Sequence, residues 1–342
     1  MALSFGHQAL VNVLITGATG QLGKAFQVAC SQVACSQVAC SQVACSQSGI
    51  TVSLASRQMR SNEHKGMWQV DITDRKALER LFSVHRFDYV LNAAAYTAVD
   101  QAEEDEIGAF QVNDLGAGLL AECCRDSGSR LIHFSTDYVF DGAAEVGYVE
   151  SAPTHPVSAY GRSKLAGEYR VLLACPDALV FRISWLFGVY GRNFVKTMLN
   201  LARTRKQLRV VDDQRGGPTF AGDLAQWVLA FLGIGDEPSG QACKPAVPTA
   251  RICHVPTIPS VSWYEFACEI FRQAETLSLL PHSVEVIPVS SSEFPSKVKR
   301  PANSVLATEV PRVDELGPLS WRDGLSTCLH VWSQFPELLW YD

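Results

Sequence analysis

A glycine-rich turn directly after an apolar strand constrains the fold of this chain more than any other feature. Val11–Thr16 reads VNVLIT, a short continuous apolar run, and GATGQLG follows at once from Gly17 to Gly23. A lone GxxGxxG is a weak signal, but between a strand and the start of a helix it is typical of a dinucleotide site. Glycines let the backbone approach a pyrophosphate, and the helix N-terminus offers free N–H groups to it. The alternative is an ordinary strand–turn–helix unit that binds no ligand.

Apolar segments alternate with helical patterns through the first half of the chain. After the first strand, the segments that read as strands buried on both faces are Ile50–Ala55, Tyr89–Ala94, Arg130–Ser135 and Ala178–Ile183. Helical patterns lie over Arg75–Val84, over Glu104–Asp126 and from about Ala159. Strands that alternate with helices predict an α/β fold, a Rossmann-type doubly wound parallel sheet.

The second half of the chain is less regular and predicts a smaller C-terminal lobe. Pro and Gly are frequent over 236–259, where we expect a surface excursion, and again over 295–318. The 342 residues are many for one core. We therefore expect a dinucleotide-binding domain over 11–185 and a mainly substrate-binding lobe over 186–330, interleaved with that domain.

The segment VACSQ occurs four times in succession over 28–47, in the first predicted helix or just after it. A helix that begins near Gln21 crosses the sheet by about Ser31 or Gln32, and the strand from Ile50 must begin close by. Only two residues, Ser48 and Gly49, would lead back from a helix continued through every copy. Two residues, even fully extended, span too little distance to return the chain to that strand. We therefore expect the extra copies to loop out, as a disordered excursion or a short helical hairpin, with no catalytic role.

Composition argues against several classes of function. A net charge of −6 disfavours a nucleic-acid-binding surface, and there is no apolar run of the length, about 18 residues, that a membrane span needs. Met1–Leu10 contain no Lys, no Arg and no long apolar core, so we do not expect a signal peptide. The 11 cysteines lack the paired spacing of a zinc site. Their scatter favours free thiols in the cytoplasm over a disulfide framework.

The end of the second predicted strand indicates which dinucleotide is bound. NAD sites usually carry a carboxylate there, which holds the ribose 2′-hydroxyl. This chain instead has Ser56 and Arg57, and no carboxylate before Glu63. Because the planar fork of Arg can pair with a 2′-phosphate, we expect NADPH, with NADH and a merely solvated Arg57 as the alternatives. Asp71 and Ile72 follow a short apolar stretch and are placed to meet the adenine edge.

Tyr160 and Lys164 share one face of a predicted helix. A free phenol has a pKa of about 10, and a nearby ammonium draws that pKa toward neutrality, where acid–base catalysis is effective. Thr136 ends the fourth predicted strand, where open α/β sheets place their sites, and can fix a substrate oxygen. YxxxK alone is usually an exposed helix pair. Together with the strand end and the glycine turn it predicts a catalytic site.

Longer motifs carry a resemblance to a known family. They are LITGATGQLG at 14–23, VLNAAAYTAVDQAE at 90–103, HFSTDYVFDG at 133–142, PVSAYGRSKLAGE at 156–168, RISWLFG at 182–188, RVVDDQRGGPTFAGDLA at 209–225, VSWYEFACEI at 261–270 and RPANSVL at 300–306. The chain resembles the extended short-chain dehydrogenase/reductases and, within them, the dTDP-4-dehydrorhamnose reductases. The resemblance spans about residues 11–330, except for the VACSQ tract and a weaker stretch over 236–259.

The resemblance implies that NADPH reduces the 4-keto group of a nucleotide-linked deoxysugar, dTDP-4-dehydrorhamnose to dTDP-L-rhamnose. It implies that Tyr160 protonates the C4 oxygen, that Lys164 lowers the pKa of Tyr160 and holds the nicotinamide ribose, and that Thr136 hydrogen-bonds the same oxygen. Further cofactor contacts are implied for the glycine turn and the third strand end, at Gly17, Gly20, Gln21, Leu22, Gly23, Ala93, Ala94 and Ala95. Substrate contacts are implied for Asp137, Tyr138, Trp185, Asn193 and the segment 214–219.

Other functions on the same frame stay open at this point. They are a nucleotide-sugar epimerase, a reductase of another keto-sugar, and a non-catalytic module similar to the regulatory subunit of methionine adenosyltransferase. Some family members are described as binding magnesium through an acidic residue soon after the glycine motif. Lys24, Ala25 and Phe26 stand there in this chain, so we expect no metal. A homodimer is an open alternative to a monomer, and Trp185 could equally be a core aromatic.

Overall fold

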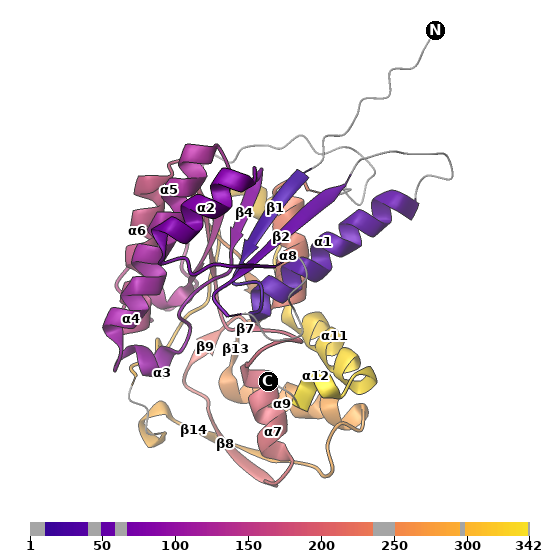
Figure 1. Cartoon of the computed structure of the whole chain (residues 1–342). Coiled ribbons are helices and arrows are strands. Elements are labelled where there is room, and N and C mark those ends of the chain that lie inside the picture. The colour runs from indigo at the N-terminus through magenta and orange to yellow at the C-terminus, as the bar shows by residue number, and fades with distance from the viewer. Residues whose placement is uncertain (1–10, 40–48, 59–66, 235–249, 295–297, 341–342) are drawn as a thin grey trace.

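A parallel sheet of seven strands forms the centre of the part of the chain that the computed structural model describes, residues 11–39, 49–58, 67–234, 250–294 and 298–340 (Figure 1). Every pairing in this sheet is parallel. Its order is β11 Ile252–His254, β6 Leu179–Ile183, β5 Arg130–Thr136, β4 Tyr89–Asn92, β1 Val11–Thr16, β2 Ile50–Ser56 and β3 Met67–Gln69. The sheet winds outward in both directions from β1, which confirms the predicted doubly wound fold.

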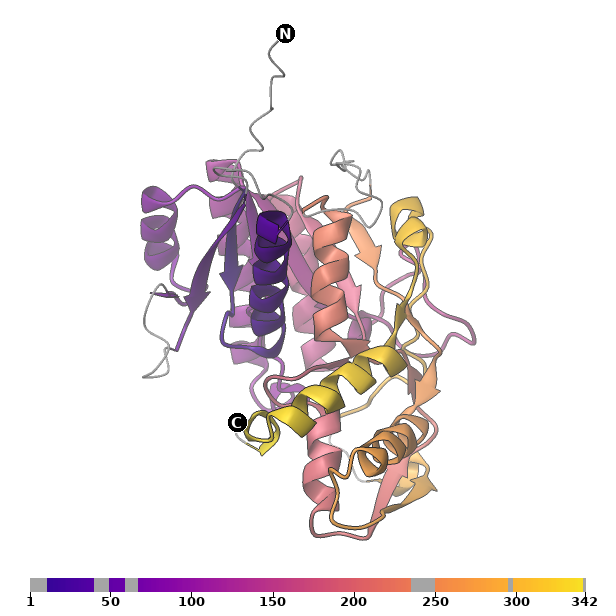
Figure 2. The same ribbon diagram turned by 90° about the vertical axis from the view of Figure 1, so that its right-hand side faces the viewer.

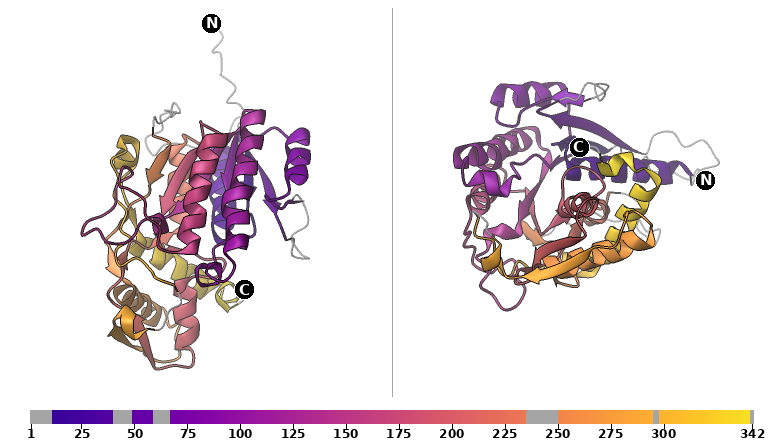
Figure 3. Two further views of the ribbon diagram at one scale, coloured as in Figure 1. Left: turned by 90° about the vertical axis from the view of Figure 1, so that its left-hand side faces the viewer. Right: turned by 90° about the horizontal axis from the view of Figure 1, so that it is seen from below.

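Helices cover both faces of the sheet (Figures 1, 2 and 3). α1 Gln21–Ala39 and α8 Ala221–Phe231 cover one face; the other carries α2 Arg75–Val84, α4 Glu106–Phe110, α5 Ala117–Ser127 and α6 Ala159–Ala174. Alternate residues of β1 serve the two faces. Val13 and Ile15 belong to the core beneath α1 and α8, whereas Leu14 belongs to the core beneath α2 and α5. A strand buried on both faces must be apolar throughout, which is why VNVLIT carries so few polar residues.

A smaller lobe lies beyond the carboxyl ends of the strands (Figures 1 and 2). Its helices are α7 Phe194–Ala202, α9 Trp263–Thr276, α11 Trp321–Gln334 and α12 Glu337–Trp340. Its parallel pair is β8 Gln207–Val211 with β14 Glu285–Val289. A separate core of large side chains holds it together, including Phe266, Trp321 and Trp332.

Short elements join the lobe to the sheet layers. They are β7 Leu186–Phe187 with β10 Thr219–Phe220, β9 Arg215–Gly216 with β13 Val261–Ser262, and β12 Thr257–Ile258 with β15 Leu319–Ser320. α3 Val99–Ala102 precedes α4, and α10 Pro311–Leu316 packs on α8. Because α8 and β11 come from after residue 186 yet belong to the sheet layers, the chain crosses between the layers more than once.

The first helix departs from the prediction. α1 runs from Gln21 to Ala39, so the expected end near Ser31 or Gln32 is wrong. The VACSQ copies contain no Gly or Pro, and Ala and Gln favour the helix, so nothing in the repeat stops it. Residues 40–48, where part of the looping-out was predicted, lie outside the described residues, as do the lead-in over 1–10 and most of the 236–259 excursion.

The predicted helix over Glu104–Asp126 contains a π-helical turn. η1, Gln111–Gly116, separates α4 from α5. Asn113 uses this turn to reach neighbouring elements, since its side chain pairs with the Tyr96 backbone and donates to the Ser163 hydroxyl of α6 at 3.0 Å. Such turns often occur beside functional sites, and this one brings the Asn113 side chain into hydrogen-bond contact with α6.

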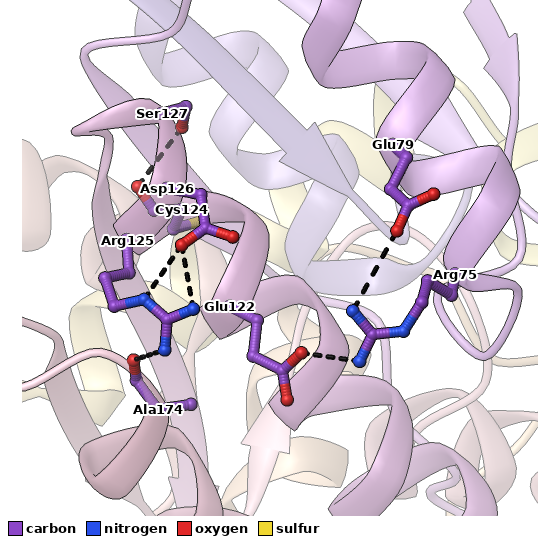
Figure 4. A network of polar contacts seen from close by, with 8 residues as sticks. All are labelled: Arg75, Glu79, Glu122, Cys124, Arg125, Asp126, Ser127 and Ala174. Carbon is purple, nitrogen blue, oxygen red and sulfur yellow. Dashed lines mark hydrogen bonds and ion pairs between the residues drawn. The ribbon is translucent and has the colours of Figure 1, made fainter.

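Exposed charged side chains connect α2, α5 and α6, which cover one face of the sheet (Figure 4). Arg75 of α2 pairs with Glu122 of α5 at 2.5 Å and lies 3.9 Å from Glu79. Arg125 of α5 pairs with Asp126 at 2.8 Å and donates to the Ala174 carbonyl at the end of α6. Solvent screens such pairs, so each contributes little to stability.

The structure gives free thiols at Cys30, Cys123, Cys124, Cys175, Cys253, Cys268 and Cys328, and all of these but Cys268 are buried. Within the described ranges, no helix has both the length and the apolar character that crossing a membrane requires.

Candidate active site

Three cavities adjoin one another at the carboxyl ends of the strands, all lined by described residues. We call them the glycine cavity, about 250 Å³, beside Gly17 and Arg57; the tyrosine cavity, about 520 Å³, around Tyr160; and the outer cavity, about 750 Å³, in the lobe. Gly20, Ala93 and Ala95 line both the glycine and the tyrosine cavities. Val99, Tyr138 and Trp263 line both the tyrosine and the outer cavities. The three therefore lie in a row, which we call the channel.

The glycine turn packs too tightly for side chains. Gly17 has φ +64°, and a Cβ there would lie 2.6 Å from the backbone of Ala93 and Ala94. A Cβ on Gly23 would lie 2.3 Å from the Gly17 carbonyl oxygen. Gly20 lines both the glycine and the tyrosine cavities, so a side chain at this position would take up space where they adjoin. The turn thus keeps the backbone and the N-terminus of α1 open to a ligand.

The far end of the glycine cavity holds the residues predicted to meet the adenosine half. Arg57 is exposed at the rim, next to Ser56, whose hydroxyl is 3.0 Å from that of Thr19. Asp71 and Ile72 line the wall. Asp71 Oδ1 accepts hydrogen bonds from the Thr73 backbone N–H and hydroxyl, at 2.9 and 2.8 Å.

Close packing places α6 against the end of β5. The Ser158 hydroxyl caps the helix by accepting from the Gly161 N–H at 3.1 Å. A Cβ on Gly161 would lie 2.2 Å from the Tyr138 carbonyl oxygen, so only glycine allows this approach. As a result Thr136, Tyr160 and Lys164 all line the tyrosine cavity, together with Asp137 and Tyr138. The rings of Tyr138 and Tyr160 meet edge to face, 5.7 Å between centroids.

Lys164 is almost wholly buried, and its Nζ donates to the Phe134 carbonyl at 2.6 Å. Burial lowers the pKa of Lys164 to about 8, and Glu168 one turn further along α6 opposes that effect. Glu168 is buried too, and it accepts a hydrogen bond from the Ser135 hydroxyl. Its two carboxylate oxygens also accept from the guanidinium of Arg182 in β6, at 2.9 and 2.6 Å. A buried ion pair thus lies directly beneath the site.

The pKa of Tyr160 shifts in the opposite direction to the prediction. Burial raises it above the ordinary value of a phenol, and a hydrogen bond with Thr136 offsets only part of the rise. Lys164 is not among the groups that shift it, and its ammonium donates to the Phe134 carbonyl. The predicted lowering by Lys164 is therefore not found in this structure. A protonated phenol is nevertheless the state that a proton donor requires.

Trp185 follows β6 and lines the tyrosine cavity. It has φ +46°, which is strained for a bulky residue. Its indole N–H donates to the Ser304 hydroxyl at 3.1 Å, and its ring stacks on Trp263 with 3.5 Å between centroids. A Cβ on Gly216 would lie 2.5 Å from the indole, so this glycine makes room for it.

Gly23 and Asn193 are predicted site residues that line none of the three cavities. Asn193 caps α7 through the Lys196 N–H, and its amide donates to Gln21 Oε1 at 2.9 Å and to the Gly188 carbonyl at 2.8 Å. Its role as a substrate ligand stays a prediction. From the segment 214–219, Gln214 alone lines the outer cavity.

Several residues of the channel were not singled out from the sequence. Trp263 separates the tyrosine cavity from the outer cavity, and Arg209, Lys299 and Arg300 bring positive charge to the outer cavity. Arg300 also donates to Asp100 at 2.8 Å. The motifs VSWYEFACEI and RPANSVL contain Trp263 and Arg300, so their signal was present, but nothing in the sequence said which member faces the channel.

Comparison with known proteins places the chain among reductases of nucleotide sugars. The family model described as the RmlD substrate binding domain matches residues 11–333. The dTDP-4-dehydrorhamnose reductase of Aggregatibacter actinomycetemcomitans is 39% identical over 75% of this chain and 85% of its own. The dTDP-4-keto-6-deoxy-D-glucose reductase of Streptomyces niveus is 38% identical over 75% and 84%. A crystal structure of dTDP-4-dehydrorhamnose reductase from Bacillus anthracis in complex with NADP is 31% identical, with a TM-score of 0.75 over 94% of this chain and 99% of that one.

Proposed function

The chain belongs to the family defined by the RmlD substrate binding domain, and we propose that it uses NADPH to reduce dTDP-4-dehydrorhamnose to dTDP-L-rhamnose. One observation carries the proposal beyond the family. Thr136, Tyr160 and Lys164 line a single cavity that adjoins the glycine cavity on one side and the outer cavity on the other. A cofactor and a nucleotide sugar entering from opposite ends would meet at Tyr160.

The glycine cavity fits a dinucleotide. Gly17, Gly20 and the free N–H groups of α1 offer a close backbone surface and a helix N-terminus to a pyrophosphate, and Arg57 stands where a 2′-phosphate would lie. Ala93, Ala94 and Ala95 continue this surface toward Lys164. When bound there, NADPH supplies the hydride.

The protein's part of the reaction is to position the ketone and to supply its proton. Tyr160, kept protonated by burial, donates to the C4 oxygen, and Thr136 holds the same oxygen. The buried Lys164 ammonium stabilises the negative charge that develops on that oxygen. Asp137, Tyr138 and Trp185 border the space for the sugar.

The outer cavity is suited to the nucleoside diphosphate. Arg209, Lys299 and Arg300 suit a pyrophosphate, and the rings of Trp263 and Phe294 suit a base. The proposal keeps the division at residues 185 and 186, with the lobe carrying this substrate half. A homodimer and a cytoplasmic location are further parts of the proposal, tested by sedimentation and by cell fractionation.

Relatives of nearly equal identity act on different sugars, 39% for the dehydrorhamnose reductase and 38% for the keto-deoxyglucose reductase. The test is therefore NADPH oxidation with dTDP-4-dehydrorhamnose, with its UDP counterpart, and with dTDP-4-keto-6-deoxy-D-glucose. We expect the highest kcat/KM with the first. Interconversion of sugars without net NADPH consumption would identify an epimerase. Dinucleotide binding without turnover of any keto-sugar would identify a regulatory module.

A further inference from the structure

Asp137 is a buried carboxyl group at the reaction cavity that the mechanism above does not use as an acid. Its residue is 2% exposed, and Oδ1 accepts a hydrogen bond from the Thr136 hydroxyl at 2.9 Å. Oδ2 has no partner of ordinary hydrogen-bond geometry among the described residues, although the Ser304 hydroxyl, like that of Thr136, lowers the pKa of Asp137. Thr136 is the residue through which the carboxyl reaches the proposed catalytic group.

The Thr136 hydroxyl has one proton and two lone pairs. The structure commits the proton to Asp137. One lone pair receives the Tyr138 N–H at 3.2 Å. In this arrangement Thr136 has no proton left for a ketone oxygen.

A neutral Asp137 reverses this hydrogen bond. Its own O–H then donates to the second lone pair of Thr136 Oγ1. The Thr136 proton is released toward the cavity, where the C4 oxygen of a bound ketone would lie.

We propose that Asp137 is a positioning residue whose protonation sets the direction of the Asp137–Thr136 hydrogen bond, so that only the neutral form lets the Thr136 hydroxyl donate to the substrate. The inference rests on the proposed reductase function. It gives Asp137 a role beyond contact with the sugar.

Both forms of Asp137 are accessible at physiological pH. Burial raises the pKa of Asp137 to about 7. The titratable and charged side chains that line the tyrosine cavity with Asp137 are Tyr138, Tyr160, Lys164 and Arg192. Arg300, which is paired with Asp100, lines the adjoining outer cavity. Because the carboxyl is neutral below its pKa, kcat/KM falls as the pH rises through about 7. The second alkaline step, from Lys164, follows at about 8.

The test compares the pH profiles of kcat/KM for wild type and Asp137→Asn. The carboxamide N–H donates to Thr136 at every pH and so imitates neutral Asp137. Between about pH 6 and about pH 8 we expect wild type to lose roughly tenfold and Asp137→Asn less than about threefold, whatever its absolute level. The matched control is Asp223→Asn in α8, whose carboxyl pKa burial also raises, to about 6; its profile should follow wild type.

Infrared spectroscopy gives a readout that does not depend on activity. Near pH 6 the free wild-type enzyme should show protonated-carboxyl absorption from both Asp137 and Asp223. Asp137→Asn should remove only the Asp137 part of this absorption, and Asp223→Asn should leave that part in place. If Asp137→Asn does not fold, Thr136→Val serves instead, because it disconnects the carboxyl and should also remove the limb at about 7. An unchanged limb in a folded variant, or an unchanged band, overturns the inference. Absence of turnover in wild type overturns the proposed function instead, and the band still tests Asp137.

Discussion

At the scale of single residues, Tyr160 should separate catalysis from binding. Tyr160→Phe removes the proton donor and keeps the ring that packs on Tyr138. We expect turnover to fall by at least about 10²-fold, the scale of a general acid, with the affinity for NADPH little changed. The matched control is Tyr169→Phe, an exposed tyrosine on the same helix. Near-normal turnover of Tyr160→Phe would contradict the assignment of the proton donor.

Arg57 should distinguish the two nicotinamide cofactors. Its guanidinium stands at the rim of the glycine cavity, beside Ser56. A charge-assisted bond to a 2′-phosphate contributes about 1.5–3 kcal/mol, so Arg57→Ala should weaken NADPH roughly ten- to a hundredfold and leave NADH nearly unchanged. Fluorescence titration of both cofactors measures this, with the exposed Arg80→Ala as the control. Equal losses for the two cofactors would show that Arg57 does not read the phosphate.

The sequence predicted which residues lie together where those residues are neighbours along the chain, while their catalytic roles stay predictions. Tyr160 and Lys164 share one helix face, and the glycine turn directly follows its strand, so local spacing brings these groups to the site. Trp263 and Arg300 come from distant segments that only tertiary packing brings to the channel. The pKa of Tyr160 could not be predicted, because it depends on burial and on the Phe134 carbonyl that holds the Lys164 ammonium.

At the scale of elements, the Glu168–Arg182 pair joins α6 to β6 and, through Ser135, to β5. Both side chains are at most 3% exposed. Glu168→Gln keeps the volume but leaves a buried guanidinium without its counter-charge, so we expect a loss of about 3–5 kcal/mol in the free energy of unfolding. The exposed Arg162–Glu106 pair gives the control, since Glu106→Gln should cost less than about 1 kcal/mol. Equal losses in chemical denaturation would contradict this account.

The VACSQ tract should be dispensable. Deleting 33–47 removes 15 residues and leaves one copy. Gln32, the last residue kept before the junction, pairs with Gln226 of α8 at 3.0 Å, and the buried Ala29 and Cys30 are retained too. We expect turnover and NADPH affinity to stay within about twofold. A folded deletion variant that cannot bind NADPH would show that the tract belongs to the site.

Elements were predictable in proportion to their length and apolar character. The longer sheet strands stood out as apolar runs, although β2 is only partly buried, and α2 begins and ends where its pattern predicted. β3 and β11 have three residues each, too few for a pattern, and complete the sheet only by pairing with β2 and β6. The length of α1 was mispredicted because only two cases were considered, a helix that ends after the first VACSQ copy and one that continues through all four. The helix instead ends at Ala39, within the third copy.

At the scale of the whole molecule, the positions of the three cavities account for the return of the polypeptide from the lobe to the sheet layers. The glycine and tyrosine cavities belong to the sheet layer, the outer cavity belongs to the lobe, and Trp263 stands between them. Catalysis requires both halves to hold their ligands within contact distance, which favours interleaved layers over two separate domains.

The most direct test of the central claim is the fate of the hydride. The protein is incubated with dTDP-4-dehydrorhamnose and NADPH carrying two deuterium atoms at nicotinamide C4, and the sugar product is examined by NMR spectroscopy and mass spectrometry. The account predicts that each NADPH consumed places one deuterium on C4 of the product sugar, and that Tyr160→Phe abolishes most of this transfer. Product formed without deuterium at C4, or sugar conversion without NADPH consumption, would contradict it.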